Sequence, residues 1–156
     1  MPLDDDRITI AGLFFEAHAG LAHVLGEALE QDCELPAQWF EVLIRIGRSP
    51  EGRLRMADLA AQVALSPSGL TRAVDRLEAA GLVARTECPN DRRGAYTVLT
   101  EAGRQRLSVA LPVHLEHLDR HLVAALTPEE LESFSGALRK LRDHVNPSAA
   151  QVTAPS

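Results

Sequence analysis

The sequence contains little cysteine, few aromatic residues and no long uninterrupted apolar run. Its two cysteines, Cys33 and Cys88, lie far apart without CxxC spacing, which argues against a metal knuckle and a disulfide scaffold. No stretch of 18 apolar residues occurs and residues 1–6 are acidic, unlike a signal peptide, so we expect a cytoplasmic protein. A phosphate-binding loop, HExxH and GxSxG are also missing, so we expect neither an enzyme nor a cofactor.

Charge is distributed unevenly along the 156 residues. The net charge of −6 argues against a general nucleic-acid coat, yet the stretch from Arg53 to Arg104 carries eight arginines against six acidic residues. This mildly basic middle inside an acidic frame suits a binding module whose two ends have another task. The length and the 46% of hydrophobic residues allow one core of ordinary size.

Two short amphipathic helices joined by a tight turn are predicted on either side of residues 64–66. Ser66 suits the cap of the second helix, Pro67 suits its first position, and Gly81 ends it. This arrangement is typical of a helix-turn-helix, whose second helix presents its polar face to the major groove of DNA. The apolar face of that helix consists of Leu70, Ala73, Val74 and Leu77, and its polar face of Ser68, Thr71, Arg72, Asp75 and Arg76.

A β-hairpin with a basic tip is predicted directly after the helix-turn-helix. Residues 82–87 and 95–99 have the pattern of strands, and the segment between them contains Pro89 and Gly94, which are typical of turns. In this position a hairpin is the wing of a winged helix, which can reach the neighbouring minor groove. Residues 53–55 are predicted to add a minimal strand before the first helix of the motif.

Long helices with apolar stripes are predicted on both sides of this module. They cover residues 8–32, residues 100–126 with a kink at Pro112, and a last helix that starts at the capping box of Thr127. The last helix repeats apolar residues at spacings of three and four, namely Leu131, Phe134, Leu138, Leu141 and Val145. Such a seam requires a partner helix, so we expect a homodimer that brings two readers to two DNA half-sites.

The predicted fold is therefore mainly α with a small β-hairpin wing, a winged helix-turn-helix flanked by N- and C-terminal dimerisation helices. A central helix at residues 37–47 belongs to the DNA-binding domain. The expected division is a flexible N-terminus at residues 1–7, a helical dimerisation region at residues 8–35 and 100–146, the winged helix-turn-helix domain at residues 36–99 and a disordered tail at residues 147–156.

Three segments together resemble the MarR (multiple antibiotic resistance regulator) family: residues 77–85, residues 91–93 and residues 98–103. The resemblance runs from about residue 8 to 145. It implies a bacterial homodimeric repressor that binds a palindromic operator and is released by a small ligand. Carried over by position, it implies DNA contacts by Ser66, Ser68, Thr71, Arg72, Arg76, Arg92 and Arg93, and a structural role for Asp91 in the wing. Arg53 and Arg55 are candidate clamps on the DNA backbone.

The resemblance also suggests where an effector would bind. A cleft for a small aromatic or anionic ligand would be lined by Phe14, Phe15, His18, Trp39 and His114. One alternative is a zinc-responsive regulator of the same fold, which would use His114, His117 and His121 on one side of a helix. The other is a winged helix used as a protein-interaction module, which would not need arginines on both the second helix and the wing.

Overall fold

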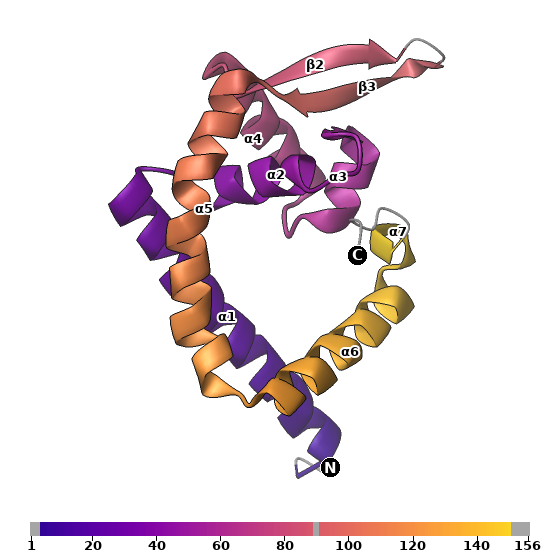
Figure 1. Cartoon of the computed structure of the whole chain (residues 1–156). Helices are drawn as coiled ribbons and strands as arrows, with labels where there is room; N and C mark the ends of the chain where they lie inside the picture. The colour runs from indigo at the N-terminus through magenta and orange to yellow at the C-terminus, as the bar shows by residue number, and fades with distance from the viewer. Residues whose placement is uncertain (1–3, 89–90, 151–156) are drawn as a thin grey trace.

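A computed structural model describes residues 4–88 and 91–150 of the chain. The long helix α1 (Asp6–Cys33) runs beside α5 (Glu101–His121) on one side of an open centre (Figure 1). A 3-10 turn, η1 (Val123–Ala125), then reverses the chain into α6 (Pro128–Val145), which forms the other side.

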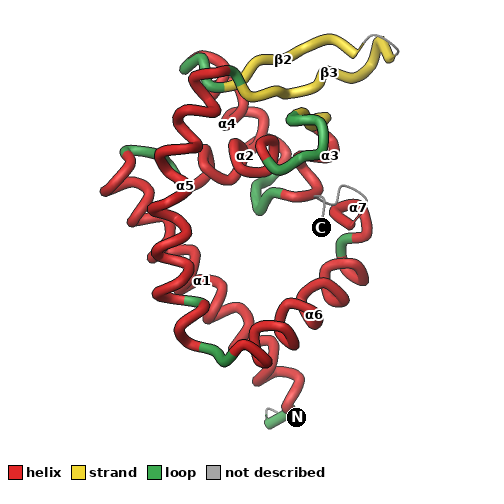
Figure 2. The backbone as a smooth tube through the Cα atoms, viewed as in Figure 1, coloured by secondary structure: helices red, strands yellow, loops and turns green. Residues whose placement is uncertain are grey.

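The elements between α1 and α5 form the predicted winged helix-turn-helix at the opposite end of the molecule from the N-terminus (Figure 1). The three strands make one antiparallel sheet in the order β1-β3-β2, and Figure 2 shows the β2–β3 hairpin extending away from the helices. Strand β1 pairs Arg55 with Tyr96 of β3, and β2 pairs Arg85 with Thr97. The bounds are α2 (Ala37–Gly47), β1 (Arg53–Arg55), α3 (Met56–Gln62), α4 (Pro67–Ala79), β2 (Val83–Cys88) and β3 (Asp91–Leu99).

Helix α2 lies at the centre of the hydrophobic core. Its side chains Val42, Leu43 and Ile46 are 0% exposed, and α2 contacts α1, α3, α4, α5, β1 and β3. Burying each such side chain contributes about 1.5–3 kcal/mol relative to exposure. The core of the winged helix and the base of the long helices are therefore one continuous apolar cluster, joined through α2.

The hairpin is fixed to the start of α5 through a short polar junction. Thr100 caps α5, because its hydroxyl accepts a hydrogen bond from the Gly103 amide at 3.0 Å and donates one to the Gly81 carbonyl at 2.6 Å. Gly81 has φ +73°, a left-handed conformation that favours glycine. The backbone of Leu82 passes so close to Gly103 that a Cβ there would overlap with the Leu82 carbonyl oxygen.

The structure differs from the sequence-based expectation at three helix ends. Helix α5 ends at His121 rather than near residue 126, where the chain tightens into η1. At the N-terminus, Asp5 caps α1 by accepting a hydrogen bond from the Arg7 amide at 2.9 Å, so the helix already begins within the segment expected to be flexible. At the C-terminus, Pro147–Ala150 forms a further short helix, α7, rather than a disordered tail.

Helix α7 is ordered by contact with α3 of the winged helix. The Asn146 side chain donates a hydrogen bond to the Ala61 carbonyl at 2.8 Å, and Ala149 is buried. The remainder of the predicted tail, residues 151–156, and residues 1–3 lie outside the described part of the chain.

Substitution of Gly103 by Ala is expected to lower the free energy of unfolding by about 1–3 kcal/mol, because the backbone at Leu82 must move away. The matched control is Gly136→Ala in α6, where an added Cβ meets nothing within 4 Å and a stabilisation of roughly 0.5–1 kcal/mol is expected. Urea unfolding followed by circular dichroism measures both. Equal stability of the two variants would show that the junction is not tightly packed.

Candidate nucleic-acid interface

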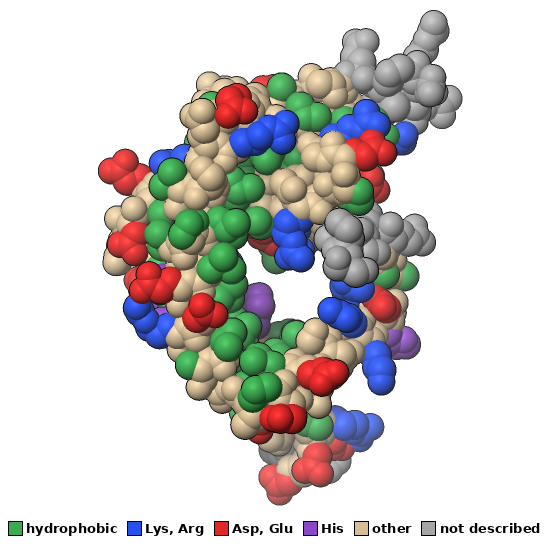
Figure 3. Space-filling model, in the orientation of Figure 1, with side chains coloured by type: hydrophobic (Ala, Val, Ile, Leu, Met, Phe, Trp, Pro, Cys, Tyr) green, Lys and Arg blue, Asp and Glu red, His purple; other side chains and the backbone are tan. Residues whose placement is uncertain are grey.

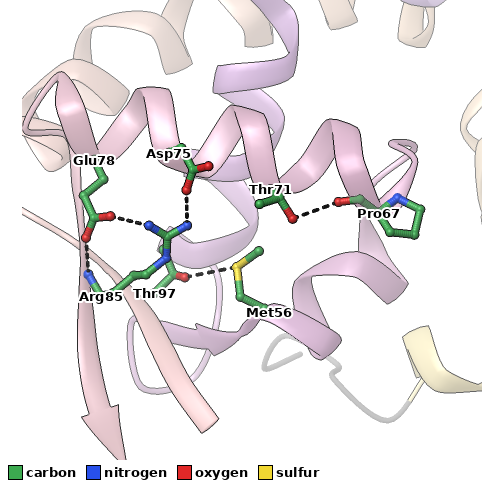
Figure 4. Close-up of polar contacts among 7 residues, drawn as sticks. All are labelled: Met56, Pro67, Thr71, Asp75, Glu78, Arg85 and Thr97. Carbon is green, nitrogen blue, oxygen red and sulfur yellow. Dashed lines mark hydrogen bonds and ion pairs between the residues drawn. The ribbon is translucent and has the colours of Figure 1, made fainter.

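The second helix of the motif, α4, has the two faces that the sequence predicts. Its N-terminus is capped by Ser66, whose hydroxyl accepts a hydrogen bond from the Gly69 amide at 3.1 Å. Pro67 occupies the first helical position, and the Thr71 hydroxyl returns to the Pro67 carbonyl at 3.0 Å (Figure 4). The four predicted apolar residues, Leu70, Ala73, Val74 and Leu77, are all buried, which fixes the helix on the core.

The opposite face of α4 is exposed to solvent. Ser66, Ser68, Thr71, Arg72 and Arg76, which were predicted to contact DNA, are all exposed. Neither Arg72 nor Arg76 makes a hydrogen bond or ion pair with any other residue in the described ranges 4–88 and 91–150. Their guanidinium groups are therefore available for phosphate oxygens or for the acceptor edge of guanine, the groups that arginine most often binds in DNA.

Arg53 and Arg55 form a second basic site beside the first helix of the motif. Both guanidinium groups lie against the ring of Tyr96 on the neighbouring strand, at 4.5 and 5.3 Å from its centroid. Arg53 also pairs with Glu51, and Arg55 donates a hydrogen bond to the Tyr96 hydroxyl at 3.4 Å. The sequence analysis did not identify Tyr96, because only the register of β1 with β3 places it between the two arginines.

The predicted wing residues lie at the far end of the hairpin. Strand β3 begins at Asp91, which pairs with Cys88 across the turn, so Asp91, Arg92 and Arg93 are at the tip. The side chains of these three residues lie outside the described part of the chain, and their roles stay predictions.

An ion-pair cluster that the sequence analysis missed joins the hairpin to α4. Arg85 of β2 reaches Asp75 and Glu78 of α4, and its guanidinium lies between the two carboxylates (Figure 4). The Arg85 amide also donates a hydrogen bond to Glu78 at 3.1 Å. Asp75 beside it raises the pKa of the Arg85 guanidinium.

The five predicted effector residues do not share one cavity within a single chain. Phe14 and Phe15 of α1 line a groove of about 760 Å³ opposite the apolar seam of α6. In Figure 3 hydrophobic side chains gather along one border of the open centre. His18 is exposed on α1, whereas Trp39 packs on the core and the His114 ring lies 4.5 Å from the Phe40 ring.

The three histidines of α5 have different neighbours. Burial lowers the pKa of His114, with His117 contributing, so the His114 ring is neutral near pH 7. His117 lies 3.9 Å from Asp32 of α1 and stacks on His121 at 5.7 Å between ring centroids. No three His, Cys, Asp or Glu side chains in the described residues are grouped so that they could hold a metal ion, so the zinc alternative gains no support.

Comparisons with known proteins agree with this geometry. A sequence model described as the MarR family matches residues 34–94. The transcriptional repressor MdtR of Bacillus subtilis is 33% identical over 139 residues, which cover 89% of this chain and 84% of MdtR. The regulator YwhA of the same organism is 32% identical over 90 residues, so the chain spans 64% of its length.

A solved structure with the same fold contains DNA. Sco3205 of Streptomyces coelicolor, a MarR family transcriptional regulator crystallised in complex with DNA, superposes with a TM-score of 0.82 at 32% identity, covering 94% of this chain and 95% of Sco3205. The chain belongs to the MarR family and is a DNA-binding transcriptional regulator with a winged helix. Members of this family are regulators of transcription rather than enzymes.

Arg72 and Leu77 lie on opposite faces of α4, and their replacement is expected to separate binding from folding. Arg72→Ala should weaken binding to a specific DNA site by about 1–3 kcal/mol, with helix content unchanged. Leu77→Ala, which empties a fully buried site, should lower the free energy of unfolding by about 2–5 kcal/mol. Gel-shift titration and urea unfolding measure the two effects. Unchanged DNA binding by Arg72→Ala and Arg76→Ala would mean that α4 is not the reading helix.

Proposed function

We propose that the chain acts as a homodimeric repressor that binds a palindromic operator, with α4 of each subunit in the major groove and each hairpin in the adjacent minor groove. The observation that carries this proposal is the apolar surface that α1 and α6 leave uncovered in a single chain. The proposal has two parts, the dimer and the way the dimer meets DNA.

The dimer is supported by the exposure of the α6 seam. None of the 18 residues of α6 is buried, although Phe134, Leu141 and Val145 are large apolar residues with 40%, 46% and 67% exposure. An apolar patch of this kind in a soluble protein marks an interaction site. All five predicted seam residues, Leu131, Phe134, Leu138, Leu141 and Val145, line the groove that faces Phe14 and Phe15.

Helix α1 contributes to the same surface. By length and composition it is apolar enough to cross a membrane, with a mean hydropathy of 1.4 over a window of which 0% is buried in the single chain. Its packing against α5, and the position of Phe14 and Phe15 opposite α6, favour a second copy of the chain as the occupant. Such a dimer would lie in the bacterial cytoplasm, where the DNA is.

The mode of DNA binding is supported by the two exposed arginines of α4 and by the relatives. The MarR protein of Escherichia coli, 26% identical with a TM-score of 0.75, has been solved with operator DNA, and MdtR is named a repressor. A two-fold symmetric dimer reads two half-sites of inverted sequence, so its operator is palindromic. A protein-interaction module would have no need for Arg72 and Arg76 to stay free of partners within the described residues.

The proposal includes release of the operator by a small aromatic or anionic ligand. Trp39 and the neutral His114 are the candidate contacts, because both lie where α2 meets the long helices. Phe14 and Phe15 belong to the surface that the second copy would cover, so they are weaker candidates than the sequence suggested.

Replacing Phe134 by Glu should convert the dimer to a monomer, because a carboxylate would have to be buried in the seam without a partner. Sedimentation velocity is the measurement. Since each monomer then grips one half-site, affinity for the full operator should fall about a hundredfold or more.

Val109→Glu is the matched control, because Val109 is 61% exposed on α5 and does not line the groove. It should sediment as a dimer and bind the operator like the parent. A parent chain that sediments as a monomer, or a Phe134→Glu variant that remains dimeric, would contradict the proposed assembly.

A further inference from the structure

The contact between Arg85 and α4 is placed where the two predicted DNA-reading elements meet. Asp75 and Glu78 lie on α4, and Arg85 lies on the first strand of the hairpin, three residues after its start. The guanidinium Nη2 is 2.5 Å from Asp75 Oδ1, while Nη1 contacts Glu78, so both carboxylates are joined to one side chain (Figure 4).

This contact involves both the side chain and the backbone of Arg85. The Glu78 carboxylate accepts hydrogen bonds from the Arg85 amide and from its guanidinium, which fixes the direction in which β2 leaves the body of the domain. Arginine presents several donors in a rigid plane, so a pairing of this kind sets an angle as well as a distance. The remaining link on this side is the hydroxyl of buried Thr97, which contacts the Met56 sulfur at 3.6 Å.

The same contact controls the charge that α4 presents to DNA. Within α4 the cations Arg72 and Arg76 are balanced by Asp75 and Glu78, so the helix alone has no net charge. Asp75 is 56% exposed on a helix predicted to enter the groove of a polyanion. Arg85 compensates that repulsion, because its charge lies directly between the two carboxylates.

We propose that Arg85 is a positioning residue for DNA binding. It holds the hairpin to Asp75 and Glu78 at the angle that lets α4 and the hairpin tip meet the same duplex. This inference rests on the proposed DNA-binding mode of α4 and the hairpin. Asp75 and Glu78 are accordingly needed for operator binding in spite of their negative charge.

The sign of the effect of Asp75→Asn separates this role from a simple charge effect. Removal of a negative charge near DNA strengthens binding by electrostatics alone. Loss of the brace has the opposite consequence. We expect affinity for a specific operator to fall about tenfold, a typical size for a buried or multiply bonded charge pair, while affinity for random DNA is unchanged or higher. The slope of log affinity against log salt should decrease by about one, since a hairpin phosphate contact is lost.

Asp58→Asn is the matched control for charge. Asp58 lies in the first turn of α3 and makes no contact with Arg85. This variant should bind the operator as tightly as the parent or more tightly. Arg85→Lys, which keeps the charge but not the planar donor set, should weaken operator binding to an intermediate degree with an unchanged thermal unfolding midpoint.

A double-mutant cycle excludes a direct contact of Asp75 with a base. If Asp75 acts through Arg85, the variant carrying Asp75→Asn and Arg85→Gln should bind no more weakly than Arg85→Gln alone. Additive losses, or an Asp75→Asn variant that binds the operator as well as the parent, would overturn the inference.

The proposed DNA-binding mode fails separately from this inference. If Arg72→Ala weakens binding and Asp75→Asn does not, only the positioning role of Arg85 is wrong. If Arg72→Ala and Arg76→Ala both leave binding unchanged, the assignment of α4 itself is wrong, and the inference fails with it.

Discussion

Burial of helix α2 is the constraint on which the rest of the structure depends. Val42, Leu43 and Ile46 are fully buried, and α2 contacts the long helices on one side and α3, α4 and the sheet on the other. Interiors packed at this density transmit displacements, because side chains have no free volume into which to relax. A change in the angle between α1 and α5 is therefore transmitted to α4 through α2. This connection gives a physical route from an effector or a partner subunit to the DNA-reading helix.

The surface of the winged helix follows from the faces of α4. Because one face is committed to the core, every polar side chain of the other face is held in a known direction, with Arg72 and Arg76 unpaired within the described residues. The three acidic or basic contacts of Arg85, Asp75 and Glu78 then tie the hairpin to this helix. Reading helix and hairpin are thus positioned by one apolar face and one ion-pair cluster.

Local patterns in the sequence were sufficient to predict most of the fold. The faces of α4, the capping box at Thr127 and the hairpin depend on residues close in sequence, and all are confirmed. The contacts of Arg85 with α4 and of Tyr96 with β1 were not predicted, because they depend on strand register and on how the hairpin leaves the helix. The short helix α7 was missed for a similar reason, since tertiary contact with α3 orders a segment whose own sequence favours a tail.

The central claim is that two copies of α4, related by two-fold symmetry, read consecutive major grooves. Hydroxyl-radical footprinting of the parent protein on a DNA site selected from random sequence tests it most directly. The account predicts two equivalent protected regions on one face of the duplex, with centres about 10 base pairs apart and inverted sequence symmetry. A single protected region the size of one half-site, without inverted symmetry, would contradict it.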